Sequence, residues 1–187
     1  MSRSSSFTHQ HMNVITQQHF CLVIDRCKRE YLQQSVVLSS IEASSLAVKD
    51  VNGDEKPDII VRRLDEEDIV VLLNTGNGTF STLTSYSTGF SAYSIVVGDV
   101  NGDDKPEIVW VDRSDDQIHV RFNNGNGRFG QPITYPVGEN PLYLAVADVN
   151  GDDHSDIIVT INSEDNIGVL LNNGDDTFTA GDTYSYM

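Results

Sequence analysis

The chain has 187 residues and a formal net charge of −16, from 28 acidic and 12 basic side chains. Such an acid excess argues against nucleic acid or an anionic membrane as a partner. Its apolar segments are short, and the run at residues 20–24 is too short for a signal-peptide core or a membrane span. We therefore expect no membrane insertion and find no signal peptide in this sequence.

Residues 1–35 differ in composition from the rest and are expected to form a flexible, non-repeat extension. They are rich in Ser, His and Gln and lack the repeat described below. Both cysteines, Cys21 and Cys27, lie here, and a local disulfide and two free thiols are both compatible with their spacing. A metal cluster of these cysteines with His19 matches no standard spacing.

From residue 36 onward, one sequence unit occurs three times at a spacing of 49 residues. An acidic segment (DVNGDEKPDIIV in the first copy) begins at Asp50, Asp99 and Asp148. A second segment (LLNTGNGTF in the first copy) ends in the same register at Phe80, Phe129 and Phe178. A fixed period of this length is typical of a solenoid or a propeller.

Each acidic segment places oxygen-bearing side chains at positions 1, 3, 5 and 9 of a loop, and position 7 can add its main-chain carbonyl. Calcium takes six to eight oxygen ligands, and loops of this spacing bind it. Magnesium demands tighter octahedral geometry, and zinc or copper would need His or Cys. We expect up to three Ca²⁺ per chain. The predicted ligands in loop 50–58 are Asp50, Asn52, Asp54, the carbonyl of Lys56, and Asp58. Those in loop 99–107 are Asp99, Asn101, Asp103, the carbonyl of Lys105, and Glu107. Those in loop 148–156 are Asp148, Asn150, Asp152, the carbonyl of His154, and Asp156.

Two other interpretations fit these loops less well. An EF-hand needs a bidentate Glu at position 12, but this chain has Val61, Trp110 and Val159 there. Simple polar turns are also rich in Asn, Gly and Asp, yet three in-register copies that keep an acid at position 9 favour a metal site. Position 6, usually Gly in such loops, is Glu55, Asp104 and Asp153. Because Glu tolerates a left-handed backbone less well than Asp, the first loop fits the pattern least well.

Short apolar runs predict four strands in each repeat. In the first copy these are residues 46–48, 59–61 and 69–73, with a more polar fourth strand that begins at Phe80, and the same segments recur 49 and 98 residues on. An Asn/Gly cluster typical of a tight hairpin joins the last two. Four antiparallel strands in a repeat of this length indicate one propeller blade. We expect an all-β fold with three four-stranded blades over residues 36–187.

The DVNGD-x-K-P-D-I loop followed by N-N-G-N-G-x-F resembles the FG-GAP/VCBS repeats of integrin-like β-propellers, and the resemblance covers residues 45–187. It implies that each loop lies between the first two strands of a blade and binds calcium at the positions that match the motif. The absence of Gly at position 6 and of a Gly-Ala-Pro element favours the VCBS-like end of the family over an integrin-like ligand site.

The resemblance implies a non-enzymatic, calcium-stabilised module that recognises protein or glycan ligands in adhesion. Extracellular calcium would fill such sites and cytosolic calcium would not, so we expect a location at the cell surface or outside the cell. A multivalent lectin completed by oligomerisation is the alternative, and Tyr86, Tyr135 and Tyr184 recur at one repeat position. A propeller part of a larger hydrolytic enzyme is a further alternative, since paired carboxylates are abundant. However, the acids fall in three equivalent loops, and the sequence has no nucleophile elbow, HExxH motif or phosphate-binding loop.

Propellers close with about four to eight blades. Three blades therefore predict either missing blades of a longer chain or association of copies, and a symmetric dimer would supply six.

Overall fold

The structure is a computed structural model that describes residues 43–89, 92–163 and 165–185. The chain divides into two units, Met1–Val37 and Leu38–Met187, and the description that follows concerns the second. The expected extension at residues 1–35, with Cys21 and Cys27, lies outside the described residues, so its properties stay predictions.

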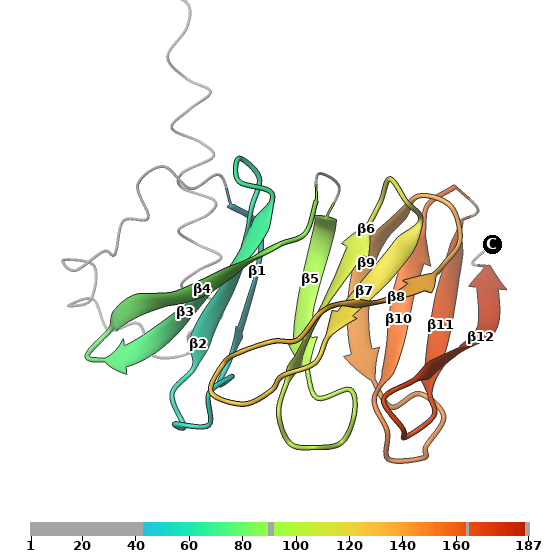
Figure 1. The fold of residues 1–187 in the computed structure, drawn as a ribbon. Coiled ribbons are helices and arrows are strands. Elements are labelled where there is room, and N and C mark those ends of the chain that lie inside the picture. The colour runs from blue at the N-terminus through green and yellow to red at the C-terminus, as the bar shows by residue number, and fades with distance from the viewer. Residues whose placement is uncertain (1–42, 90–91, 164, 186–187) are drawn as a thin grey trace, which may run out of the picture. The chain divides into compact units, whose positions relative to one another are not determined.

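Three antiparallel sheets of four strands each make up this part of the chain (Figure 1). The first contains β1 (Ala43–Lys49), β2 (Asp58–Arg63), β3 (Asp68–Gly76) and β4 (Thr79–Ser87). The second contains β5 (Ala92–Gly98), β6 (Glu107–Asp112), β7 (Gln117–Arg121) and β8 (Ile133–Pro136). The third contains β9 (Pro141–Ala147), β10 (Asp156–Ile161), β11 (Asn166–Asn172) and β12 (Phe178–Ser185). Within each sheet, every strand pairs with its neighbour in sequence, as in a propeller blade. The expected all-β fold of three four-stranded blades is confirmed.

The strand register repeats with the sequence. Val48 pairs with Ile59 in the first blade, and the pairs 49 and 98 residues later have the same register. A slip of one residue would turn every side chain to the other face of its sheet. The shared register therefore means that equivalent residues face the same way in all three blades.

The outer strand of the second blade differs from expectation, because it begins at Ile133 instead of Phe129. Phe129 makes only an isolated bridge to Asn123. The segment between them contains Pro132, which has no N–H to donate to a sheet. Gly130 instead bonds to the carbonyl of Phe122 and accepts a hydrogen bond from the Arg121 guanidinium. The delayed start therefore follows from local sequence that the other two blades lack.

Each blade has two apolar faces, and the core lies between successive blades. We call the face toward the following blade the forward face and the opposite one the backward face. Between the first and second blades, a cluster joins Ile60, Ile69 and Val71 to Ile95, Ile108 and Trp110. Between the second and third blades, a cluster joins Val109, Ile118 and Val120 to Ile157, Val159 and Leu170. Fully burying one such side chain contributes about 1.5–3 kcal/mol, so these contacts between blades stabilise the fold strongly.

In the described part of the chain, no helix is long and apolar enough to cross a membrane.

Candidate metal loops

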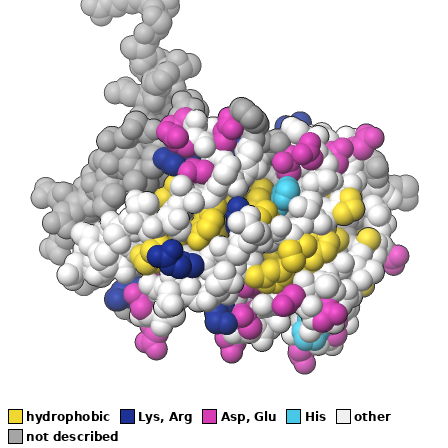
Figure 2. All heavy atoms as spheres, in the orientation of Figure 1, with side chains coloured by type: hydrophobic (Ala, Val, Ile, Leu, Met, Phe, Trp, Pro, Cys, Tyr) yellow, Lys and Arg dark blue, Asp and Glu magenta, His cyan; other side chains and the backbone are white. Residues whose placement is uncertain are grey.

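Each acidic loop connects the first two strands of its blade: residues 50–57 join β1 to β2, residues 99–106 join β5 to β6, and residues 148–155 join β9 to β10 (Figure 1). This is the position that the repeat resemblance implied. Asp and Glu side chains line the upper and lower edges of the face shown in Figure 2, with apolar side chains between them.

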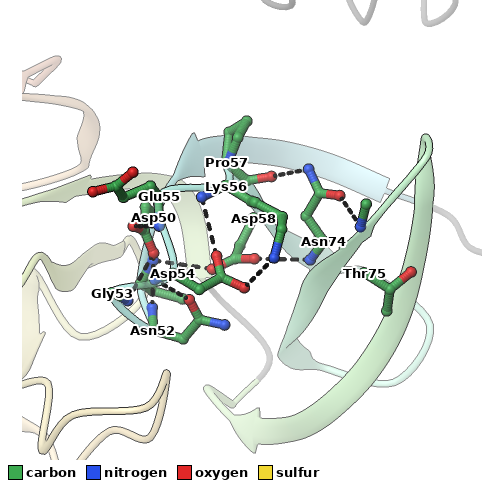
Figure 3. A network of polar contacts seen from close by, with 12 residues as sticks. Asp50, Asn52, Gly53, Asp54, Glu55, Lys56, Pro57, Asp58, Asn74 and Thr75 are labelled. Carbon is green, nitrogen blue, oxygen red and sulfur yellow. Dashed lines mark hydrogen bonds and ion pairs between the residues drawn. The ribbon is translucent and has the colours of Figure 1, made fainter.

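In the first loop, the side chains at positions 1, 3 and 5 hold the backbone in a tight turn (Figure 3). The carboxylate of Asp50 accepts hydrogen bonds from the N–H of Gly53 at 2.8 Å and of Glu55 at 2.7 Å. Asn52 Oδ1 accepts from the N–H of Asp54 at 3.0 Å. These short polar side chains therefore curl the loop around their own oxygens, as Asx turns do.

The second and third loops repeat this arrangement. Asp99 accepts from the N–H of Gly102 at 2.7 Å and of Asp104 at 2.9 Å. Asp148 accepts from the N–H of Gly151 at 2.7 Å and of Asp153 at 3.0 Å. The N–H of Gly151 and its neighbours holds the pKa of Asp148 below its usual range. The carboxylate of Asp148 is thus kept ionised without burial.

The backbone at position 6 is left-handed in all three loops, with φ of 64° at Glu55, 63° at Asp104 and 68° at Asp153. This is the conformation expected at a position that usually holds Gly. Left-handed backbone costs a residue with a Cβ about 1–2 kcal/mol, although Asp bears it better than Glu. The first loop therefore carries the most backbone strain.

The position-9 acid is the first residue of the second strand and is fully buried: Asp58, Glu107 and Asp156 are each 0% exposed. Each joins its loop to the end of the third strand. Glu107, for example, accepts from the N–H of Val100 at 2.9 Å and of Asn123 at 3.3 Å. Burial raises the pKa of Glu107 to about 7 and also raises that of Asp58. A cation beside these carboxylates would offset the cost of burying their charge.

The donor set of each loop fits a hard cation, because it consists of carboxylate, amide and carbonyl oxygens. In the second loop, one oxygen each from Asp99, Asp103 and Glu107 lie within 4.8 Å of one another. In the part of the chain that the structure describes, this is the group of three acidic side chains whose oxygens lie so close together. Glu107 is one methylene longer than the Asp found at position 9 of the other loops, which lets its carboxylate reach further.

A lysine at position 7 sits close to the first two sites. Lys56 Nζ lies 3.0 Å from Asp54 Oδ2, and Lys105 Nζ lies 2.8 Å from Asp103 Oδ2. The hydrogen bond from Lys56 holds the pKa of Asp54 below its usual range. The third loop has His154 at this position, and its ring packs against Gly174, where an added Cβ would come within 2.8 Å of Nε2. The His154 ring therefore lies against Gly174, and its main-chain carbonyl stays the predicted ligand of the third loop.

The structure adds a residue type that sequence reasoning missed, an Asn at the end of each third strand. Asn123 Nδ2 donates to the carbonyl of Pro106 in its own loop at 3.2 Å and to that of Val51 in the preceding loop at 3.0 Å. Asn172 does the same toward Ser155 at 3.0 Å and Val100 at 2.6 Å. Each of these side chains couples the acidic loops of two neighbouring blades. Their recurrence every 49 residues was the available signal.

A second polar group lies between the first two blades. Trp110 is 1% exposed and stacks on the ring of His119, with 4.7 Å between ring centroids. The guanidinium of Arg121 lies over both Trp110 and Tyr86. Burial lowers the pKa of His119, against the opposing effect of Asp112. Trp110 is a core residue, as expected, and His119 is part-buried against it.

Three comparisons with known proteins bear on this architecture. The model of the FG-GAP-like repeat family matches residues 50–110 and 100–159. No curated protein sequence matches the chain. A solved lectin from Agrocybe aegerita, described by its specific recognition of non-reducing terminal N-acetylglucosamine, superposes with a TM-score of 0.51 at 22% identity, over 74% of this chain and 37% of the lectin chain.

The Photorhabdus luminescens Tc holotoxin pore is similar with a TM-score of 0.51 at 20% identity, over 86% of this chain and 7% of the toxin chain. The chain therefore spans well under half the length of either structure. At these identities the likeness concerns the fold alone.

Proposed function

Because the chain belongs to the FG-GAP-like repeat family, we propose that it is a non-enzymatic binding module whose propeller-type blades are stabilised by calcium. The observation that carries the proposal is the threefold recurrence of one loop geometry with oxygen donors at positions 1, 3, 5, 7 and 9. The close approach of Asp99, Asp103 and Glu107 supports an ion at the second loop.

The role proposed for calcium is structural. The position-9 acid joins each loop to its own third strand, and Asn123 and Asn172 join the second and third loops to the blade before them. An ion that orders one loop would therefore order contacts between blades. With dissociation constants of about 0.1–1 mM and millimolar calcium, each site would add roughly 0.5–2 kcal/mol of stability.

The same reasoning supports a location at the cell surface or outside the cell, where calcium is millimolar. In cytosolic calcium these sites would be nearly empty, and their crowded carboxylates would oppose folding. The acidic edges visible in Figure 2 also make nucleic acid and anionic membranes poor partners. The expected ligand is a protein or a glycan.

Glycan binding is the second candidate, and one surface feature favours it. Tyr93 and Tyr143 are 38% and 58% exposed, and their rings meet edge to face with centroids 5.7 Å apart. The guanidinium of Arg113 lies 5.6 Å from the Tyr93 ring centroid and bonds to Asn140 Oδ1. Exposed aromatic rings beside amide and guanidinium donors suit sugar rings. By contrast, Tyr86 and Tyr135 are packed against Phe129 and Phe178 between blades.

The calcium proposal is tested by thermal unfolding of the full chain in 2 mM calcium and in chelator. Asp148→Asn keeps one oxygen to accept from Gly151 but loses the charge that a cation needs. It should lose about a third of the calcium-dependent rise in melting temperature and little in chelator. The matched control is Asp182→Asn, which removes a charge from an exposed strand position and should behave as the unmodified chain does. An unmodified chain that melts at one temperature in both conditions would refute a calcium role.

The glycan candidate is tested separately by titration with N-acetylglucosamine and a glycan panel. Binding that is lost in Tyr143→Ala and kept in Tyr184→Ala would support the Tyr93–Tyr143 surface. If no glycan in the panel binds, protein recognition stays the proposed function.

A further inference from the structure

The forward face of the third blade carries the residue types that join the other blades, but among the described residues it has no blade in front of it. Ile60, Ile69 and Val71 on the first blade are all 0% exposed, because the second blade covers them. Their equivalents on the second blade are equally buried. On the third blade the equivalents are only part-buried, and these are Ile158, Ile167 and Val169.

The valine at position 2 of each acidic loop shows the same difference in exposure. Val51 and Val100 are 2% and 0% exposed, because each inserts into the following blade. The carbonyl of Val51 accepts from Asn123 Nδ2 and from the N–H of Gly127 at 2.9 Å. Val149 occupies this position in the third blade and is 53% exposed. An apolar side chain that elsewhere serves as an inter-blade contact is here in solvent.

A tyrosine on each outer strand gives a third, independent comparison. Tyr86 meets Phe129 of the next blade edge to face, with ring centroids 5.8 Å apart, and its hydroxyl accepts from the N–H of Phe129. Tyr135 meets Phe178 in the same way at 5.4 Å. Tyr184, the third copy, is 57% exposed. The forward face of the third blade therefore keeps a complete set of joining residues.

The backward face of the first blade matches what such a face receives. It carries Leu46, Val48, Ile59, Val61, Leu72 and Phe80. Each of these residues has the same residue type 98 positions later, on the backward face that the second blade already packs against. The corresponding face of the second blade is less similar, since it carries Trp110 and Arg121. The first blade is thus the best copy within this chain of a surface known to fit.

We propose that copies of this chain associate head to tail, with the forward face of the third blade packing on the backward face of the first blade of a second copy. In this interface Val149 enters the second copy, its carbonyl accepts from Asn74 Nδ2, and Tyr184 meets Phe80. A head-to-tail interface of this kind closes into a ring if its rotation allows and otherwise continues as a filament. The proposal goes beyond the proposed function and depends neither on calcium nor on the ligand.

The two faces of the proposed interface differ in how far they are exposed in the single chain. Ile59, Val61 and Leu72 are at most 4% exposed in the single chain, so the first blade has to uncover this cluster to receive its partner. Association that requires such a change is slower than docking of preformed surfaces. Measurements therefore need long incubation, at physiological salt that screens repulsion between copies of charge −16.

The test is sedimentation velocity of the full chain from about 1 to 200 μM after overnight incubation. We expect the unmodified chain to form dimers or larger species as concentration rises. Val169→Glu places a carboxylate in the proposed interface and should weaken association at least roughly 100-fold, since a buried unpaired charge is very unfavourable. Leu64→Glu is the matched control, because Leu64 is 43% exposed in the turn between β2 and β3. It should associate as the unmodified chain does, and circular dichroism checks that both variants are folded.

A double-mutant cycle then tests the predicted aromatic pair. Tyr184→Ala and Phe80→Ala should each weaken association roughly 2- to 12-fold, and the double variant should be no weaker than the worse single variant. An unmodified chain that stays monomeric over the whole range would overturn the proposal. So would equal association of Val169→Glu and Leu64→Glu, or strictly additive effects in the cycle.

Discussion

The Asn that joins neighbouring acidic loops allows a stability prediction with a control inside the same chain. Asn123→Ala removes a side chain that reaches both its own loop and the preceding one, whereas Asn74→Ala removes the equivalent side chain of the first blade. Asn74 Nδ2 bonds to the carbonyl of Pro57 at 3.0 Å, within its own blade. The difference between the two variants measures the bond between blades.

The expected magnitude follows from the hydrogen bonds lost. Asn123 is 5% exposed and makes three, to Val51, to Pro106 and from the N–H of Gly125. A buried hydrogen bond contributes about 0.5–1.5 kcal/mol net, so the variant should lose roughly 2–4 kcal/mol. Asn74 makes two at a part-exposed position where water can replace them, and its loss should be about 1 kcal/mol or less.

The assay is urea unfolding in chelator at pH 7, with linear extrapolation to water. Working in chelator separates this effect from any loss of calcium. Asn123→Asp is a useful second variant, because it keeps the shape and the acceptor but not the two N–H donors, and it should lose at least as much stability as Asn123→Ala. Equal losses for Asn123→Ala and Asn74→Ala would refute the reasoning, since the bond between blades would then contribute nothing measurable.

Three further changes have expected outcomes. Glu55→Gly relieves left-handed strain at φ 64° and should tighten calcium binding at the first loop, as measured by calorimetry, while an unchanged affinity would contradict the loop geometry. Lys105→Gln removes an ammonium 2.8 Å from Asp103 Oδ2 and should tighten the second site several-fold at low salt, with no change expected at the third loop, which lacks this lysine. Burial lowers the pKa of His119, so the folded state binds fewer protons than the unfolded state just below pH 6.5. Stability should therefore fall as pH drops from about 6.5, and the fall should be smaller in His119→Gln, which urea unfolding at several pH values can check.

Much of the blade architecture was accessible from sequence because it depends on local pattern. The runs around Val48, Ile59 and Ile69 are short and apolar, and their repetition identified both the strands and their order. The left-handed position 6 was expected from the known shape of such loops. These features need only residues that are close in the chain, which is where sequence reasoning is strongest.

Features that depend on contacts between blades were missed. In the sequence, Asn123 looks like one more turn residue in an Asn/Gly cluster. Its role in joining two loops depends on the carbonyl of Val51, which lies 72 residues earlier. The stacking of Trp110 on His119 depends on a strand pairing that brings them side by side. The late start of β8 was visible in principle, because Pro132 interrupts the segment that forms a strand in the other blades.

The separation of Val51 from Asn123 also has a consequence for synthesis. The carbonyl of Val51 finds its side-chain donor only after 72 further residues have left the ribosome, and the carbonyl of Val100 waits as long for Asn172. At about 5–20 residues per second, this interval is roughly 4–14 s. During that time Ile60, Ile69 and Val71 have no cover from the second blade. In a nascent chain of this kind the forward face of the newest blade is therefore uncovered, and this uncovered face moves toward the C-terminus as each blade is completed.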